Sequence, residues 1–202
     1  MKVISRRKED RIIPSPKRIR RTRYACATLL LLAGVTQAQI STPAPGHLKL
    51  IDPLDRPQDG YCLDVVGSGQ YIRFDLPATA HNCKPGLYAD EAVLLQPNGY
   101  IWFPAYNKCL TAAGINGRAL PGAALVPRDC NERSPFLEAH ALQLFKLRDD
   151  AYIELASSGL CLTVGKESDS TFEPTHRWLP LFLDSCDTVE PSRSRWHFTI
   201  PR

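Results

Sequence analysis

The sequence predicts an all-β domain built from three repeats of about 50 residues each. The first observation is a repeated segment, because residues 152–163 (YIELASSGLCLT) match residues 100–111 (YIWFPAYNKCLT). Both segments place Tyr-Ile nine residues before Cys-Leu-Thr. A third Cys-Leu pair stands at Cys62-Leu63, and the cysteines that follow are regularly spaced. Repetition of this kind indicates a fold made of equivalent units.

The N-terminal segment has the layout of an export signal. Residues 1–24 hold ten Lys and Arg against two acidic residues, and an apolar run follows at 25–35. The small residues around Ala38 suit a signal peptidase, so residues 1–38 are a predicted signal peptide. The apolar run is too short to cross a bilayer as a helix. We therefore expect a secreted or periplasmic mature chain; the alternative is a membrane anchor with a basic cytoplasmic tail.

The charge balance changes once the signal segment is set aside. The whole chain carries a formal charge of +4, but the residues after Ala38 comprise 15 basic and 19 acidic side chains, a net charge of −4. No basic run occurs after residue 38. The sequence therefore predicts no nucleic-acid partner. Residues 39–49 contain two Pro, a Gly and hydroxyl residues, which predicts an extended linker before a compact domain over 50–202.

Six cysteines remain when Cys26, which lies in the apolar run, is set aside. Six cysteines allow 15 pairings, but the intervals between successive pairs favour one bridge per repeat. We expect three disulfides, each contributing roughly 3 kcal/mol by restricting the unfolded chain. A zinc cluster is the rival interpretation, but the chain has no Cys-x-x-Cys and no His-x-x-x-His, so no metal or other cofactor is expected. The predicted pairs, with intervals of 21, 21 and 25 residues, are Cys62–Cys83, Cys109–Cys130 and Cys161–Cys186.

Short strands separated by turns account for the rest of the domain. Residues 71–76 and 196–200 alternate apolar and polar side chains, and no stretch of the domain carries a helical stripe with caps. The interval from Val93 to Tyr100 equals that from Phe145 to Tyr152, so the repeats also agree beyond their cysteines. A longer loop over 131–141 enlarges the middle repeat. Three units that cannot bury an apolar face alone predict closure around a pseudo-threefold axis. Turns are expected at Pro85-Gly86, Asn98-Gly99, Asn116-Gly117, Pro121-Gly122 and Ser158-Gly159.

These motifs resemble the ricin B-chain type (R-type) lectins, a family with the β-trefoil fold. Its repeats begin with Cys-Leu-Asp-Val, which residues 62–65 match in full, whereas residues 109–112 and 161–164 have Thr in place of Asp. The family's Gln-x-Trp signature survives in part as Gln143-Leu144-Phe145 and Ser194-Arg195-Trp196. Glu91-Ala92-Val93 keeps neither residue. The resemblance covers about residues 50–202.

The resemblance implies one candidate sugar site, in the first repeat. Its parts are Asp64 as the carboxylate that accepts sugar hydroxyls, His81 in the place of the stacking aromatic residue, and Asp90 with Glu91 near the Gln-x-Trp position. Three carboxylates so close together would repel one another or attract a cation. In the alternative interpretation, Asp64 caps a turn and the acidic pair is a solvated loop. Thr111 and Thr163 are expected to be structural.

Two functions follow as expectations. The first is a secreted carbohydrate-binding protein whose partners are cell-surface glycans. The second is an adhesion or delivery subunit of a multi-chain toxin with other toxin subunits as partners, since the export signal, Pro-containing linker and degenerate trefoil are similar to the lectin-like subunits of cytolethal distending toxin. Aromatic residues such as Trp102, Tyr106 and Trp178 belong either to the core or to a docking surface. No catalytic motif is present, so we expect no enzyme.

Overall fold

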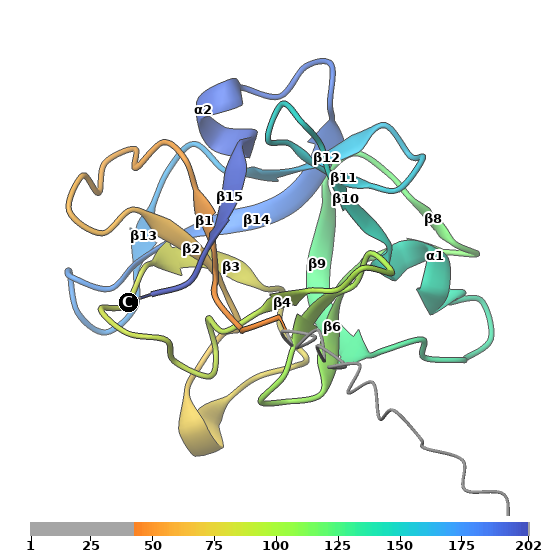
Figure 1. The fold of residues 1–202 in the computed structure, drawn as a ribbon, viewed down its shortest axis with the longest axis horizontal. Helices are drawn as coiled ribbons and strands as arrows, with labels where there is room; N and C mark the ends of the chain where they lie inside the picture. The colour runs from red at the N-terminus through yellow and green to blue at the C-terminus, as the bar shows by residue number, and fades with distance from the viewer. Residues whose placement is uncertain (1–42, 202) are drawn as a thin grey trace, which may run out of the picture. The chain divides into compact units, whose positions relative to one another are not determined.

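The computed structural model describes residues 43–201, which form a β-trefoil of three repeats (Figure 1). Each repeat contributes four strands to one sheet that curls around the core. The last strand of each repeat pairs with the first strand of the next, and β15 pairs with β1 to close the ring. The strands of the three repeats are, in order, β1 (His47–Leu50), β2 (Tyr61–Asp64), β3 (Thr79–Asn82) and β4 (Leu94–Leu95); β5 (Ile101–Phe103), β6 (Lys108–Ala112), β9 (Ala123–Asp129) and β10 (Phe145–Leu147); β11 (Ile153–Leu155), β12 (Leu160–Val164), β14 (Arg177–Ser185) and β15 (Trp196–Thr199).

One backbone hydrogen bond recurs in all three repeats and demonstrates their equivalence. A buried residue at or directly before the start of the fourth strand donates its N–H to a carbonyl just before the first strand of the same repeat. Because the first and fourth strands lie at opposite ends of a repeat, this bond closes each unit on itself. The three bonds are Val93 to Gly46 at 2.9 Å, Phe145 to Gly99 at 2.8 Å and Trp196 to Ala151 at 2.8 Å.

The second and third strands of each repeat form an antiparallel hairpin closed by a disulfide. The structure confirms the predicted pairing, Cys62–Cys83, Cys109–Cys130 and Cys161–Cys186. The three hairpins meet through β14, which pairs with both β3 and β9. The third repeat therefore contacts both of the others through one long strand.

The core is filled by equivalent positions of the three repeats. Val93 directly precedes β4, Phe145 and Trp196 begin β10 and β15, and all three are buried. Their sizes differ, yet each packs into the same cluster. Trp196 also donates its indole N–H to the carbonyl of Leu162 at 3.0 Å, which satisfies the polar edge of its ring. Burial of such side chains contributes about 1.5 to 3 kcal/mol each.

The elements outside the twelve trefoil strands lie in the connections. The predicted long loop over 131–141 leads into a short helix at its end. Within residues 43–201, no helix combines the length and the apolar character that a membrane crossing needs. The remaining elements are η1 (Gly69–Tyr71), the hairpin of β7 (Gly114–Ile115) and β8 (Arg118–Ala119), α1 (Ala139–Gln143), β13 (Asp169–Ser170) and α2 (Pro191–Ser194).

Two sequence expectations differ from the structure. Residues 47–49, assigned to the linker, lie in β1, where pairing with β15 draws them into the ring. The strand expected over residues 71–76 is wrong, because this segment follows η1 in a loop closed by a 2.8 Å hydrogen bond from the N–H of Arg73 to the carbonyl of Val66. The strand expected over 196–200 is confirmed as β15. The predicted signal peptide, residues 1–38, and the start of the predicted linker lie outside the described residues.

Candidate functional site

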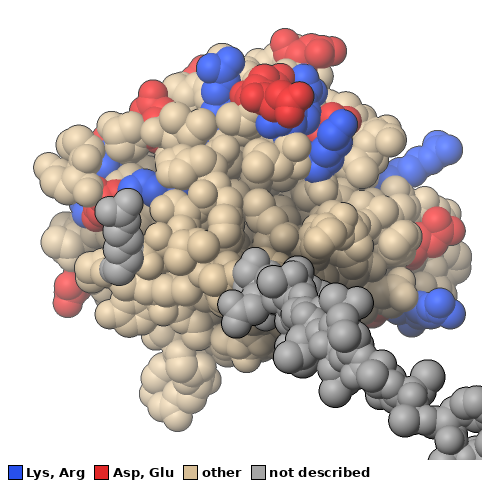
Figure 2. Space-filling view, in the orientation of Figure 1, with Lys and Arg blue, Asp and Glu red and all other residues tan. Residues whose placement is uncertain are grey.

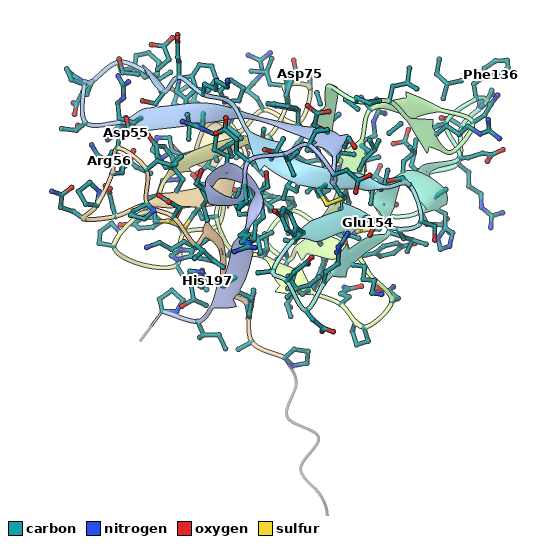
Figure 3. All side chains as sticks on the ribbon, turned by 90° about the horizontal axis from the view of Figure 1, so that it is seen from above. Asp55, Arg56, Asp75, Phe136, Glu154 and His197 are labelled. Atoms are coloured by element: carbon teal, nitrogen blue, oxygen red, sulfur yellow. A yellow bond between two sulfur atoms is a disulfide. The ribbon has the colours of Figure 1, made fainter. Side chains whose placement is uncertain are left out.

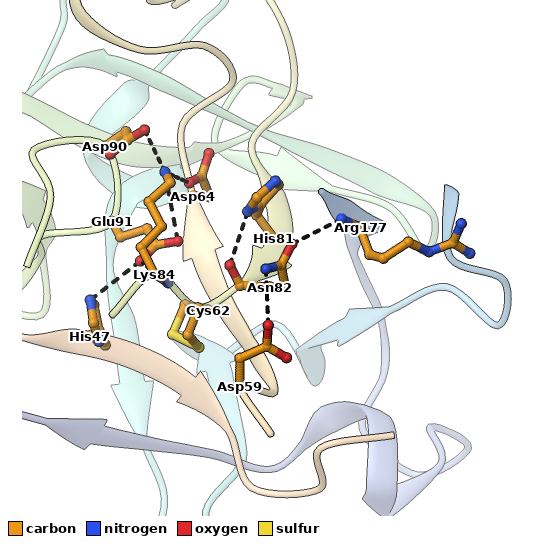
Figure 4. Close-up of polar contacts among 11 residues, drawn as sticks. His47, Asp59, Cys62, Asp64, His81, Asn82, Lys84, Asp90, Glu91 and Arg177 are labelled. Carbon is orange, nitrogen blue, oxygen red and sulfur yellow. Dashed lines mark hydrogen bonds and ion pairs between the residues drawn. A yellow bond between two sulfur atoms is a disulfide. The ribbon is translucent and has the colours of Figure 1, made fainter. Parts of the chain in front are cut away.

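Three carboxylates of the first repeat converge beside the β2–β3 hairpin (Figure 4). Asp64 ends β2, whereas Asp90 and Glu91 lie in the turn before β4. Asp64 and Asp90 are each only 4% exposed, and Glu91 is completely buried. The sequence predicted that these side chains lie together, and the structure places them together. Buried carboxylates require a compensating charge or donor, so the site must contain one.

Lys84 supplies that charge, and sequence reasoning missed it. Its Nζ lies 2.9 Å from Asp64 Oδ2, 2.6 Å from Asp90 Oδ2 and 3.7 Å from Glu91 Oε1. Lys84 directly follows Cys83, whose disulfide to Cys62 ties it to the strand that carries Asp64. The lysine therefore has a fixed starting point from which its side chain crosses the site.

Glu91 has a structural role, which is shown by comparison with the second repeat. Its Oε2 accepts the backbone N–H of Lys84 at 3.1 Å, just as Oε1 of Gln143 accepts the N–H of Asn131 at 2.6 Å. Asn131 follows Cys130 as Lys84 follows Cys83. Glu91 thus holds the loop after the second cysteine, and it supports the site from inside because no part of it is exposed. Nε2 of His47, on β1, lies 3.3 Å from Glu91 Oε2.

Burial and the lysine set the titration of this cluster in opposite directions. Burial raises the pKa of Glu91 to about 7, an effect that the Lys84 ammonium opposes. Burial also raises the pKa of Asp64, again opposed by Lys84. Burial alone would lower the pKa of Lys84, but the carboxylates of Asp64, Asp90 and Glu91 outweigh it and raise this pKa. Lys84 therefore stays protonated, and Glu91 titrates near neutral pH.

His81 lies beside the carboxylates on β3, opposite Cys62. Its Nδ1 is 3.0 Å from the carbonyl of Asn82, and burial lowers its pKa, so the ring is neutral at pH 7. The ring packs edge-on against His176 at 5.8 Å between centroids. Trp178 of β14 pairs with His81 across the sheet. The aromatic neighbours of His81 thus come from the third repeat, a contact that the repeat pattern did not indicate.

A groove with a volume of about 1560 Å³ opens beside these residues. Asp64, His81, Lys84 and Asp90 line it, and Glu91 does not. The lining continues across the hairpin of β13 and β14 to Trp178. Three of the four predicted site residues therefore border one open space, together with the lysine.

The corresponding positions of the other repeats are closed by neutral hydrogen bonds. Thr111 is fully buried; its hydroxyl accepts from Gln143 Nε2 at 2.9 Å and donates to the Cys109 carbonyl at 3.0 Å. Thr163 accepts from the Ser194 hydroxyl at 2.7 Å. Both hydroxyls are used inside the protein, so these two repeats offer no carboxylate to a ligand at this position.

The donor set of the first repeat also bears on metal binding. Asp64, His81 and Glu91 each offer one possible metal-ligand atom, and these three atoms lie within 4.8 Å of one another, a spacing that a metal ion could use. The Lys84 ammonium lies among these carboxylates and already neutralises part of their charge. A metal ion would have to displace it, so the residues present fit an internal ion pair better than a metal centre.

The face of the molecule seen in Figure 2 has no continuous basic surface. Lys, Arg, Asp and Glu side chains of both signs gather along the upper edge of that face, and other residue types cover most of the area below. Mixed charges do not form the basic stripe that nucleic acids require.

Comparison with known proteins gives matches among solved structures alone. No protein-family model matches the chain, and no curated protein matches it. The mdaA-1 domain is 19% identical with a TM-score of 0.53, and the match covers 79% of this chain and 91% of that one. The agglutinin from Abrus precatorius is 22% identical with a TM-score of 0.54 over 78% of this chain, which spans about half (49%) of the agglutinin's length.

A third match is the β-trefoil lectin of the Vibrio vulnificus hemolysin/cytolysin, solved with N-acetyl-D-lactosamine bound. It is 14% identical with a TM-score of 0.45, covering 80% of this chain and 98% of that one, a likeness too weak to carry an argument. At these identities the comparisons speak to the fold alone. Together with the three equivalent repeats, they confirm the β-trefoil fold that the resemblance to the ricin B-chain type lectins predicted.

Proposed function

We propose that this protein is a secreted glycan-binding module with a single sugar site, formed in the first repeat by Asp64, His81 and Asp90 around Lys84. The observation that carries the proposal is the hydrogen bonding of the two aspartate carboxylates. Each uses one carboxylate oxygen on Lys84, and among residues 43–201 the other oxygen has no hydrogen-bond partner. Both aspartates line the groove, so fixed acceptors for sugar hydroxyls border its open space although each aspartate is only 4% exposed.

The remaining groups suit a sugar as well. Lys84 has three N–H donors, and the contacts to Asp64 and Asp90 use two at hydrogen-bond distance. The third is available to a sugar oxygen, since Glu91 Oε1 is 3.7 Å away. The ring of His81 offers a face to the apolar side of a hexose. Such a shallow, wet site predicts a dissociation constant of roughly 0.1 to 1 mM for one sugar.

A glycan array with the purified, oxidised protein tests this proposal beside the variant Asp64→Asn. The substitution keeps the shape of the side chain but removes the charge that holds Lys84, and we expect binding to fall at least about tenfold. Asp129→Asn is the matched control, because Asp129 also pairs with a lysine, Lys108 at 2.6 Å, but lies in the second repeat outside the groove. Undiminished binding by Asp64→Asn would remove the site from this position.

Secretion is part of the proposal and has a separate test. Three disulfides are typical of proteins that mature in an oxidising compartment. We expect N-terminal sequencing of the mature protein to begin near Gln39, just after the predicted signal peptide. A mature protein that retains residues 1–38 would favour the membrane-anchor alternative instead.

The second candidate function is that of a delivery subunit in a multi-chain toxin. It is favoured by exposed aromatic side chains beside the groove, because Tyr71 is 72% exposed and Phe172 is fully exposed. Such residues often anchor protein partners. Co-purification of a toxic or nuclease-like chain would support this function, whereas a monomer that binds glycans without a partner would count against it.

A further inference from the structure

We propose that the groove binds a neutral oligosaccharide of several units, which extends from the carboxylate site of the first repeat to the β13–β14 hairpin of the third. This inference rests on the proposed glycan-binding function and names its ligand class. It differs from a single-sugar site confined to one repeat, because part of the lining comes from a different repeat.

The size of the groove is the first argument. Its volume of about 1560 Å³ exceeds the roughly 300 to 1000 Å³ that is usual for sites enclosing one compact small molecule. A single hexose at Asp64 would leave most of this space to water. An extended ligand of several rings would fill it.

The wall formed by the third repeat is held in place by a polar network. The side chain of Asn82, next to His81, accepts the backbone N–H of Arg177 at 2.9 Å and donates to Asp59 at 3.1 Å (Figure 4). Ser168 donates to Asp55 at 2.7 Å, so the same hairpin is tied to the first repeat a second time. A wall fixed before binding lowers the entropic penalty of binding a flexible chain.

The lining of the groove combines charged and aromatic side chains. Asp64 and Lys84 line the groove together with Trp178, Tyr71 and Phe172. Trp178 is half-buried, whereas Phe172 presents its whole ring to solvent. Hexose rings carry hydroxyls at their edges and an apolar face, so a chain of them matches a lining that offers both carboxylates and aromatic faces.

The charges of the lining identify the ligand as neutral. The groove has three cationic residues, Lys49, Arg73 and Lys84, and three acidic ones, Asp59, Asp64 and Asp90. Lys84 is bound by its two aspartates, and Arg73 pairs with Asp75 at 2.6 Å. Lys49 has no ion pair among residues 43–201, and the second aspartate beside Lys84 balances its charge. Cations already bound by carboxylates offer little to sulfated or sialylated chains. The balance therefore favours uncharged sugars.

The test is a chain-length series measured with the intact protein. The probes are galactose, lactose and the neutral tetrasaccharide lacto-N-neotetraose, with a sialylated tetrasaccharide for comparison. We expect the neutral tetrasaccharide to bind at least about tenfold more tightly than galactose by titration calorimetry or NMR shift mapping. We also expect Phe172→Ala to remove most of that gain, because stacking on its ring would be lost.

Phe136→Ala is the matched control. Phe136 is 75% exposed, has a positive φ like Phe172, and lies away from the groove, at the far end of the molecule from Asp55 and Arg56 (Figure 3). The inference is overturned if all chain lengths bind equally, if the sialylated probe binds best, or if Phe172→Ala behaves like Phe136→Ala. If no glycan binds at all on a broader array, the proposed function fails with it, and docking of a protein chain becomes the better explanation of the groove.

Discussion

The first and second repeats solve the same structural problem with different chemistry. In both, a side chain before the fourth strand accepts the N–H of the residue after the second cysteine, from Lys84 to Glu91 and from Asn131 to Gln143. The second repeat completes this contact with an amide-to-hydroxyl bond to Thr111. The first repeat completes it with ion pairs. The difference teaches that the charges of the first repeat form one set, in which the buried carboxylates require Lys84.

The ionic set has a functional consequence that the neutral set lacks. Gln143 and Thr111 are fully buried, and their hydrogen bonds are made with one another and with the backbone. Asp64 and Asp90 retain a carboxylate oxygen each beside an open groove. The first repeat can therefore offer unused hydrogen-bond acceptors to a ligand in the groove, whereas the second repeat uses its polar groups inside the protein.

The largest effect on stability is expected for Gln143→Glu, which places in the second repeat the glutamate that the first repeat has at position 91. The new carboxylate would be fully buried without a lysine and would lose the donors to Thr111 and the Asp129 carbonyl, each at 2.9 Å. We expect the free energy of unfolding to fall by about 3 to 5 kcal/mol at pH 7.5. Urea denaturation measures this, and the loss should shrink at pH 5, where the acid protonates. An unchanged midpoint would show that the neutral site tolerates a charge.

A smaller effect is expected when the first repeat loses its cation, by Lys84→Met. Asp64, Asp90 and Glu91 would then be buried without compensation, and we expect a loss of about 3 kcal/mol in the free energy of unfolding at pH 7.5. Lys108→Met is the control, because Lys108 pairs with an exposed carboxylate, that of Asp129, and should change stability by less than about 1 kcal/mol. Equal losses in the two variants would contradict the special position of Lys84.

The smallest effect concerns the pH dependence that Glu91 gives to the first repeat. Its pKa of about 7 in the folded protein exceeds the value of 4.5 expected for an unburied glutamate. Its contribution to stability is therefore complete below pH 4.5 and is lost as the pH rises through 7. Glu91→Gln, which copies the second repeat, should lose this dependence, gaining about 1 to 2 kcal/mol relative to the wild type between pH 5 and pH 8. Parallel pH profiles for the two proteins would refute the assignment.

The fold could be predicted to a large extent because its signals are local. A disulfide across a hairpin joins residues at a short, repeated interval, so the cysteine spacing reported all three hairpins. The strand expected over residues 71–76 failed because alternation alone cannot show whether a segment has a partner. Gly67, with a φ of +92°, begins the turn, and an added Cβ there would lie 2.2 Å from the carbonyl oxygen of Tyr71. That close approach shapes a loop, not a strand.

The candidate site could be predicted in part. Asp64, Asp90 and Glu91 lie together as their positions in the repeat implied, and of the two expectations, repulsion or attraction of a cation, the structure shows the cation. Lys84 was missed because one lysine after a cysteine looks like an ordinary surface residue. Comparison of the residue after the second cysteine in each repeat, Lys84 against Asn131, would have revealed it. The groove was beyond prediction, because the contact of His81 with His176 joins different repeats.

The three disulfides have a consequence for the order in which the protein matures. Each joins cysteines 21 or 25 residues apart, and no cysteine of another repeat lies between the two partners. As the chain emerges from its N-terminal side, each of these cysteines meets its native partner before the next repeat appears. Correct pairing from Cys62 onward therefore requires no reshuffling between repeats. The pairing of β14 with β3 and of β15 with β1 must wait for the third repeat.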